Sequence, residues 1–163
     1  MFEISKEGPQ DGPAIESLLD SAFGSGRHAR PSYALREGTN AIDALCLTAR
    51  LDGVLIGTIR YWPLVIPGVR SGLLLGPIAV DPAHGKLGIG GKLIEQSLAT
   101  ARVLGHDAVA AIGDAGYLCR FGFRPADQFG LTFTTYMAPG RFHALELLPG
   151  VLAGAGGAVS KAF

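Results

Sequence analysis

The beginning of the chain alternates between apolar and polar positions in a way that predicts one strand and one amphipathic helix. An edge strand is expected to end near Lys6. A helix follows Asp11, which is placed to cap it, and Pro13 suits its first turn because a missing N–H costs nothing there. Apolar residues recur at helical spacing over residues 15–23, so one face of this helix is predicted to be buried.

Two apolar runs on either side of an Asp-Gly step predict a β-hairpin. The runs span residues 44–49 and 54–62, and tight hairpin turns favour the Asp52-Gly53 sequence between them. A third run, residues 73–80, is apolar on both faces, as expected in the middle of a covered sheet. Gly76-Pro77 interrupts this run, and because proline removes a hydrogen-bond donor, we expect a bulge or a splay there.

A glycine-rich loop joins this third strand to a long helix. The helix is predicted from about Gly90 to Leu104, with one buried apolar stripe, and Gly105 is a natural stop. A short buried strand at residues 108–112 follows, so strand, loop, helix and strand form one βαβ unit.

The remainder of the chain predicts shorter elements. We expect a short helical segment at 113–120, a turn at 121–125, a strand at 131–137 and one more amphipathic element at 144–148. The tail from Val151 is rich in Gly and Ala and is expected to pack loosely.

The composition limits the class of protein. The chain has 163 residues, of which 48% are apolar and 17% charged, and without repeats it predicts a single domain over residues 1–163. Fourteen basic and fourteen acidic side chains cancel, so no basic field for nucleic acid is visible. Cys46 and Cys119 lie in apolar stretches and are interpreted as buried, reduced thiols. The longest apolar run, Leu73 to Val80, is too short to cross a bilayer, and the N-terminus has no signal-peptide core. We therefore expect a soluble, cytoplasmic protein that binds neither nucleic acid nor a membrane.

Residues 80–92 carry the strongest indication of chemistry. A strand ends, four glycines follow between positions 85 and 91, and a helix begins. Glycine lets a ligand approach the backbone, and the first N–H groups of a helix have no partner within it. The junction therefore suits a phosphate group, to which Lys86 and Lys92 would add positive charge.

Two nucleotide-binding motifs fail at this loop. A P-loop needs a hydroxyl residue after Gly91-Lys92, and the chain has Leu93 there, with Lys86 in place of the first glycine. A dinucleotide fingerprint would begin with Gly88-Ile89-Gly90, but its third glycine position is also Leu93, and no acidic residue closes the strand at 108–112.

The loop resembles instead the acyl-CoA loop of the GCN5-related N-acetyltransferase (GNAT) superfamily. The family pattern [Q/R]-x-x-G-x-[G/A] is similar to Gly88-Ile89-Gly90 here, after the strand ending Ile78-Ala79-Val80-Asp81-Pro82, although Gly85 replaces the family's Gln or Arg. The opening strand and helix, the hairpin and the Arg120–Pro125 turn fall in family order. Residues 113–117 are similar to the YhbS-like branch. The resemblance covers nearly the whole chain.

This resemblance implies a mixed α/β fold, with a mostly antiparallel central sheet splayed around one parallel strand pair and flanked by helices. It implies an acyltransferase that moves the acetyl group of acetyl-CoA to a primary amine of a small-molecule or peptide acceptor, by direct attack in a ternary complex and without a metal. Homodimerisation is an expectation from the family alone. The main alternative is a non-catalytic acyl-CoA-binding sensor or partner module, and a weaker one is a nucleotide-binding protein of another fold.

The resemblance also implies two sets of backbone contacts to the cofactor. Three residues at the end of the strand would pair with the pantetheine arm as an extra strand, and the amides of the loop would hold the pyrophosphate. The implied acetyl-CoA-binding residues are Ile78, Ala79, Val80, Lys86, Leu87, Gly88, Ile89, Gly90 and Gly91.

The general-acid tyrosine of the family has no direct counterpart, because its place is Leu118. The neighbouring Tyr117 is the candidate catalytic acid, since a phenol can protonate a thiolate leaving group, and a half-buried packing tyrosine is the alternative. Candidates for a general base are His84 and Glu37, each of which is also explained as a solvated surface residue.

Several further polar residues have simpler interpretations. Asp114 is expected to cap the short helix, Cys119 lacks a neighbouring base that would make it a nucleophile, and Trp62 is most simply a core residue. The segment 25–40 is polar and basic and predicts a loop or a short helix. Its four basic candidates could meet an acidic acceptor, although a solvated connector explains them as well; they are Arg27, His28, Arg30 and Arg36.

Overall fold

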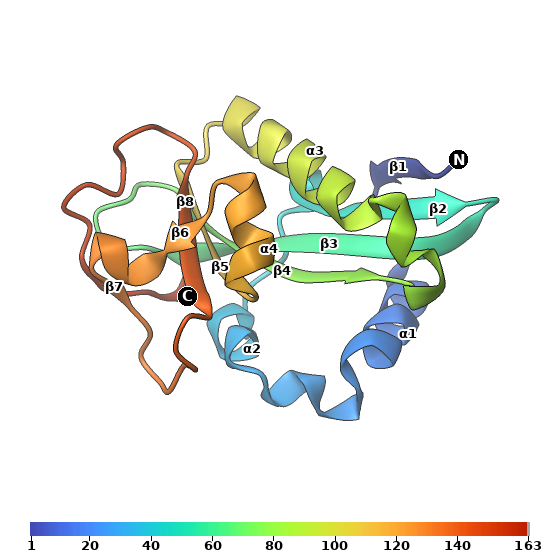
Figure 1. Ribbon diagram of the computed structural model, residues 1–163, viewed down its shortest axis with the longest axis horizontal. Coiled ribbons are helices and arrows are strands. Elements are labelled where there is room, and N and C mark those ends of the chain that lie inside the picture. Colours follow the sequence, from blue (N-terminus) through green and yellow to red (C-terminus); the bar gives the residue numbers. More distant parts are fainter. Residues whose placement is uncertain (163) are drawn as a thin grey trace.

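The computed structural model describes residues 1–162 and is built on one central sheet (Figure 1). Within these residues, eight strands form the sheet in the order β1-β2-β3-β4-β5-β8-β6, with β10 paired to β3. The strands are β1 (Glu3–Lys6), β2 (Leu47–Leu51), β3 (Val54–Val65), β4 (Gly72–Val80), β5 (Ala108–Ile112), β6 (Arg124–Pro125), β8 (Phe142–Glu146) and β10 (Ser160–Lys161). Two further strands, β7 (Leu131–Thr132) and β9 (Gly157–Ala158), pair with each other.

Helices cover both faces of the sheet. α3 (Ile89–Val103) lies on one side of β3 and β4, and α1 (Gly12–Phe23) and α2 (Pro31–Arg36) lie on the other (Figure 1). α4 (Ala115–Leu118) is a short helix near the end of β5. Five 3-10 segments link these elements: Ser25–Ala29, Asp43–Leu45, Pro82–Leu87, Cys119–Phe121 and Ala126–Phe129.

The parallel pair at the centre of the sheet confirms the fold class implied by the sequence. β4 and β5 run parallel, whereas the other neighbouring strands of this sheet are antiparallel. Pairing of β4 with β5 extends from Gly72 only to Leu75, where Gly76-Pro77 follows. The register of β4 against β3 also shifts between Ile59 and Tyr61. The expected irregularity at Gly76-Pro77 is thus confirmed, and it parts β4 from β5 at the level of the site.

The hairpin turn also follows the prediction. Asp52 and Gly53 both have positive φ, at 51° and 81°, and connect Leu51 directly to Val54 in the register. A turn with positive φ at both central residues matches the twist of the flanking strands. The first strand of the pair is shorter than predicted, because a 3-10 turn at Asp43–Leu45 precedes β2.

Two predictions about local structure in the first half of the chain were wrong. The side chain of Asp11 does not cap α1; it accepts a hydrogen bond from the Gly8 N–H and pairs with Arg50. β3 continues through Pro63 to Val65, beyond the end of the run predicted over residues 54–62. Pro63 is tolerated because the pairing of β2 with β3 has ended at Ile59, so the missing N–H interrupts no bond on that side.

The C-terminal segments also differ from the prediction. The strand expected at 131–137 is limited to Leu131–Thr132, because its partner β9 is only two residues long. The tail does not pack loosely. Leu152 and Val159 are fully buried, and β10 pairs with the end of β3. The predicted end of the domain, Phe163, lies outside the described residues.

Candidate active site

The loop between β4 and α3 presents unpaired backbone groups to one cavity. Gly88 adopts a left-handed conformation, with φ of 72°, which favours glycine at the turn into α3. No side chain among residues 1–162 caps the start of α3, so the N–H groups of residues 89–91 have neither a helical partner nor a cap. This loop borders a cavity of about 450 Å³ that Lys86, Lys92 and Arg120 also line. We call it the phosphate cavity, because its amides and cations suit an anion.

A second constraint explains why Gly90 is glycine. A Cβ atom built on Gly90 would lie 2.7 Å from the Tyr117 hydroxyl, which is closer than real Cβ contacts. Tyr117 therefore lies directly against the first turn of α3, and the close approach depends on the missing side chain.

The outer edge of β4 is open beyond the splay. Ile78 and Ala79 pair with Ile59 and Thr58 of β3 on one side. On the other side, pairing with β5 has ended at Leu75 in the part of the chain that the structure describes. The backbone from Ile78 to Val80 is thus available to pair with an extended ligand.

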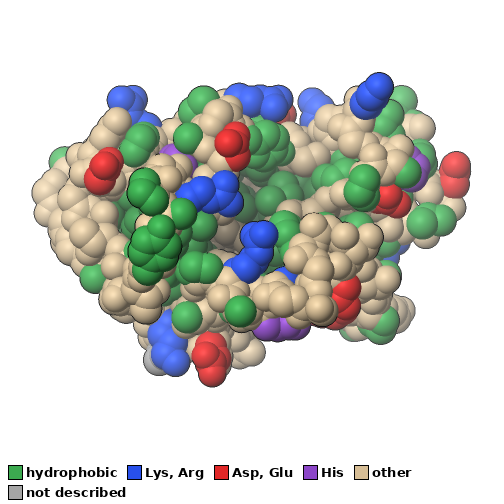
Figure 2. Space-filling view, turned by 60° about the horizontal axis from the view of Figure 1, so that its bottom comes forward, with side chains coloured by type: hydrophobic (Ala, Val, Ile, Leu, Met, Phe, Trp, Pro, Cys, Tyr) green, Lys and Arg blue, Asp and Glu red, His purple; other side chains and the backbone are tan. Residues whose placement is uncertain are grey.

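A smaller cavity lies where β4 and β5 part. Its volume is about 220 Å³, and it lies between Gly76–Ile78 of β4 and the end of β5 at Ala111–Asp114. We call it the acyl cavity. The segment that follows α1 closes it from the opposite side, with Arg27, Arg30 and Tyr33. Figure 2 brings this side of the molecule forward and shows a hollow with Lys and Arg side chains around it.

Tyr117 connects the two cavities. Of residues 1–162, it alone lines both the phosphate cavity and the acyl cavity. Its backbone N–H donates to Asp114 at 2.9 Å, and its ring meets Phe121 edge-on at 5.3 Å between centroids. Burial raises the pKa of Tyr117, and the nearby Arg120 partly opposes this. The hydroxyl therefore remains protonated at neutral pH. Leu118 lies at the wall of the acyl cavity and is 5% exposed.

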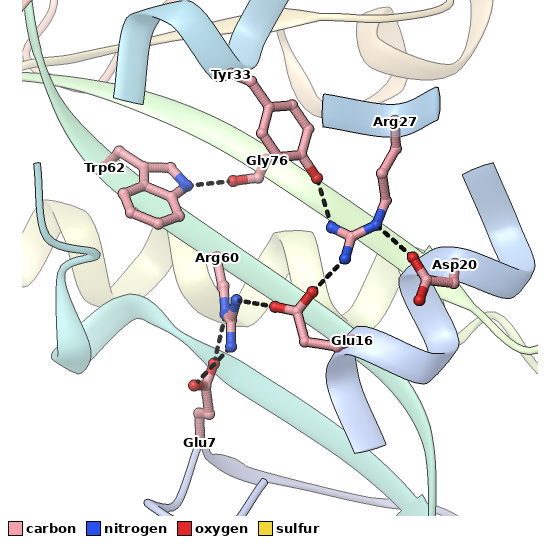
Figure 3. A network of polar contacts seen from close by, with 8 residues as sticks. All are labelled: Glu7, Glu16, Asp20, Arg27, Tyr33, Arg60, Trp62 and Gly76. Carbon is pink, nitrogen blue, oxygen red and sulfur yellow. Dashed lines mark hydrogen bonds and ion pairs between the residues drawn. The ribbon is translucent and has the colours of Figure 1, made fainter. Parts of the chain in front are cut away.

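A buried arginine fixes the segment that covers the acyl cavity (Figure 3). Arg27 is 4% exposed and is paired with Glu16 and Asp20 of α1, the second at 2.9 Å. It also donates to the Tyr33 hydroxyl at 2.6 Å. Because buried charges are retained only with partners, this cluster ties α1 to α2 in one arrangement.

Arg60 links this network to the sheet, and Trp62 makes a separate polar contact nearby (Figure 3). Arg60 of β3 pairs with Glu7 at 2.9 Å and lies 3.7 Å from Glu16. The Trp62 Nε1–H donates to the Gly76 carbonyl oxygen at 2.6 Å, and this bond holds the backbone at the splay. Trp62 therefore contributes a polar contact in addition to packing.

The other predicted candidates are spread over the molecule. His84 lies beside Asp81, 3.8 Å away, and lines neither cavity described above. Glu37 lines an open cavity next to α2. Asp114 caps α4, as predicted, and also borders the acyl cavity. Cys46 is a buried free thiol, as predicted, but the prediction for Cys119 was wrong, because this free thiol is exposed.

Two site residues were not identified from the sequence. Tyr33 and Arg141 line the acyl cavity, and they come from segments that are far apart in the chain. Neither belongs to a local motif, so only tertiary structure brings them together. Within residues 1–162, no cluster of three or more His, Cys, Asp and Glu side chains is placed to hold a metal ion. No helix in the same range has the length and apolar character needed to span a membrane.

The loop, the splay and the order of elements define an acyl-CoA-dependent type of transferase fold, and sequence comparison gives its family. A sequence model of the acetyltransferase (GNAT) family matches residues 13–122, from α1 to the turn after α4. The chain belongs to this family and is an acyltransferase.

Individual relatives agree with this assignment. YjhQ of Escherichia coli K12, an uncharacterised N-acetyltransferase, is 33% identical over 118 residues, which cover 71% of this chain and 65% of YjhQ. YhbS of the same strain, also an uncharacterised N-acetyltransferase, is 32% identical over 130 residues, covering 78% of this chain and 77% of YhbS. The predicted similarity to the YhbS-like branch is confirmed.

Solved structures show the same fold. The crystal structure of E. coli YhbS in complex with CoA superposes with a TM-score of 0.84 at 28% identity, covering 98% of this chain and 89% of YhbS. A GNAT family acetyltransferase from Brucella melitensis in complex with acetyl-CoA has a TM-score of 0.72 at 31% identity, covering 98% and 95% of the two chains.

Proposed function

We propose that this protein transfers the acetyl group of acetyl-CoA to a primary amine by direct attack in a ternary complex. The observation that carries the proposal is the continuity of the site. The phosphate cavity, the open edge of β4 and the acyl cavity follow one another, and Tyr117 joins the first to the last. The complexes of YhbS with CoA and of the Brucella protein with acetyl-CoA support this choice of donor.

The proposed binding mode uses backbone groups. The amides of residues 86–91 would hold the pyrophosphate, with Lys86 contributing charge. The backbone from Ile78 to Val80 would pair with the pantetheine arm and lead the thioester to the splay at Gly76-Pro77. Because Gly85 carries no side chain where the family has Gln or Arg, binding would rest on the amides.

The proposed chemistry needs one proton donor. The amine nitrogen forms a bond to the acetyl carbon, the carbon–sulfur bond breaks, and the amine gives up a proton to water. Tyr117 would donate its hydroxyl proton to the sulfur as it leaves, since burial keeps this phenol protonated. Positioning of the two substrates and polarisation of the thioester by backbone groups would supply most of the rate.

The first test is calorimetry of acetyl-CoA with the purified protein, followed by thiol release across a panel of amines. Binding with turnover is expected, and Tyr117→Phe should lower kcat by about 100-fold or more if its hydroxyl is the acid. Thiol release at the unaltered rate in Tyr117→Phe would show that another group protonates the sulfur. Absence of acetyl-CoA binding would refute the proposal altogether.

One observation favours a second candidate, a non-catalytic acyl-CoA sensor. The buried Leu118 stands in the place of the family's tyrosine, so the usual proton donor is missing. The two candidates predict the same affinity for acetyl-CoA. They differ in turnover, because a sensor would bind acetyl-CoA and release no thiol with any amine. A homodimer and a cytoplasmic location stay predictions.

A further inference from the structure

A larger, open cavity lies beside α2 and adjoins the acyl cavity. Its volume is about 740 Å³, and Trp62 and Tyr136 form part of its wall. Within residues 1–162, the two cavities share Arg30 and Tyr33. An acceptor that enters from the larger cavity therefore passes these two side chains before it reaches the splay.

The charges along this path do not cancel. Arg27 is neutralised by Glu16 and Asp20, so it contributes little net field. Arg30 and Arg141 also line the acyl cavity, and neither has a carboxylate within 4.0 Å among the described residues. Arg30 instead lies over the Phe23 ring, 4.8 Å from its centroid.

A third cation stands at the wall of the larger cavity. Arg36 lies between two aromatic rings, 3.6 Å from the centroid of Tyr33 and 4.7 Å from that of Trp62. Acidic residues on the path are fewer. Asp114 accepts the Tyr117 N–H at 2.9 Å, and Glu37 lies on the outer wall. The hollow with Lys and Arg side chains around it in Figure 2 is on the same side of the molecule.

The backbone of Arg141 is hydrogen-bonded on both sides, which places the residue at the wall of the acyl cavity. Its carbonyl oxygen accepts from the Gly113 N–H at 2.9 Å, and this bond joins it to the end of β5. Its own N–H donates to the Ala138 carbonyl at 3.3 Å. Arg141 is half-buried at the cavity wall, and its guanidinium has the geometry for a bidentate contact with an anion.

We propose that the acceptor amine carries an anionic group, a carboxylate or a phosphate, which Arg30 and Arg141 bind. This inference rests on the proposed function, because it names the substrate class of the same site. Two unpaired guanidinium groups attract such an anion and repel a polycation. The same charges lower the pKa of the acceptor's ammonium group and thereby favour the neutral amine, which is the nucleophile.

The test compares amines with and without an anionic group, and each rate is referred to the concentration of neutral amine, because the anionic group also changes the pKa of the amine. Glycine is paired with glycinamide, and phosphoethanolamine with ethanolamine, while spermidine represents a polycation. Thiol release from acetyl-CoA gives kcat/KM for each amine. We expect one of the two anionic amines to exceed its neutral counterpart by about tenfold or more, since a hydrogen-bonded charge contact is worth that much. Which pair shows the preference distinguishes a carboxylate from a phosphate.

Variants assign the preference to the two arginines. Arg30→Gln and Arg141→Gln should each reduce the anionic-to-neutral ratio by about tenfold. The matched control is Arg102→Gln, which removes the same charge from the exposed end of α3, where Arg102 lines neither cavity, and the ratio should not change. Calorimetry with acetyl-CoA is run on every variant, so that a loss of donor binding is not mistaken for a loss of acceptor recognition.

The outcomes separate this inference from the proposed function. The inference would be overturned, and the acetyltransferase proposal left intact, if neither anionic amine exceeded its neutral counterpart, or if spermidine were turned over as fast as the better anionic amine. The same holds if the ratio survives in both arginine variants. If no amine is turned over, calorimetry of glycine and phosphoethanolamine with the acetyl-CoA-saturated protein decides, and lack of binding by both overturns the inference.

Discussion

Replacing Gly90 by alanine tests the packing on which the site depends. The added methyl group would lie 2.7 Å from the Tyr117 hydroxyl, whereas its distances to Val80 and Ile78, 3.7 and 3.9 Å, are ordinary contacts. The tyrosine would have to move, and overpacking of this kind costs about 1–3 kcal/mol. Alanine also gains up to about 1 kcal/mol over glycine in a helix, and less near the end. We therefore expect Gly90→Ala to lower the free energy of unfolding by about 1 kcal/mol.

The sign of this effect should reverse when the hydroxyl is removed. In a Tyr117→Phe background the closest atom is absent, so Gly90→Ala keeps only its helical gain and should stabilise the protein by about 0.5 kcal/mol. The coupling energy between the two positions is then about 1–2 kcal/mol, within the range for residues in contact. Gly91→Ala is the matched control. Its Cβ would meet only Phe121, at 3.7 Å, so it should be neutral or stabilising in both backgrounds.

Urea unfolding of the two single variants, the double variant and the unaltered protein gives the cycle directly. Acetyl-CoA affinity is measured in parallel, because a displaced Tyr117 would also change the phosphate cavity. Equal stabilisation by Gly90→Ala in both backgrounds would refute the reasoning, since it would mean that the Tyr117 hydroxyl does not lie against α3.

Three more predictions concern titration and packing. If Tyr117 is the acid, kcat should fall at alkaline pH with a midpoint above 10.0, the ordinary pKa of tyrosine, because burial raises the pKa of Tyr117. This alkaline fall in kcat should be absent in Tyr117→Phe. Burial also raises the pKa of the Cys46 thiol, from 9.0 to about 11. The Cys46 thiol therefore holds its proton more tightly in the folded state than in the unfolded state. The stability that the protonated thiol contributes is fully present below pH 9 and should be lost as the pH rises to 11. Between pH 9 and pH 11, the free energy of unfolding of the unaltered protein should fall by about 2–3 kcal/mol more than that of Cys46→Ala. Parallel curves of unfolding free energy against pH for the two proteins would contradict this. Leu152→Ala should cost about 2–5 kcal/mol in denaturant unfolding, because the side chain is fully buried, whereas Leu148→Ala, at 55% exposed, should cost less than about 0.5 kcal/mol. Similar values for the two would mean that the tail is not packed.

The parts of the fold that could be predicted are those specified by neighbouring residues. The Asp52-Gly53 turn, the glycine loop before α3 and the stop at Gly105 each depend on local backbone conformation, which the residue type restricts. The amphipathic spacing of α3 likewise lies within one segment. Because these elements follow one another in the order of the family, the sheet topology could be predicted from the resemblance.

The parts that were missed depend on pairing between distant segments. The sequence of residues 131–137 alternates like a strand, but the length of β7 is set by β9, 26 positions later. The Gly- and Ala-rich tail looks weakly packed because it offers few large side chains. Leu152 and Val159 nevertheless fill a cluster with Leu64 and Leu74 of the sheet. Tertiary contacts determined both outcomes, and local pattern carried no information on them.

The same distinction separates the two halves of the site. Apart from Tyr117 and Arg120, the phosphate cavity is lined by one continuous segment, residues 80–95, so its glycines could be recognised in the sequence. The acceptor side is assembled from three segments, because Arg30 precedes α2, Tyr117 lies in α4 and Arg141 precedes β8. A cofactor that is common to a family can be bound by one local sequence motif. Recognition of the acceptor can instead use any residues that border the splay. Under the proposal above, the charge at that border selects the acceptor, and substitution of Arg30 and Arg141 is the way to test whether the acceptor can be changed.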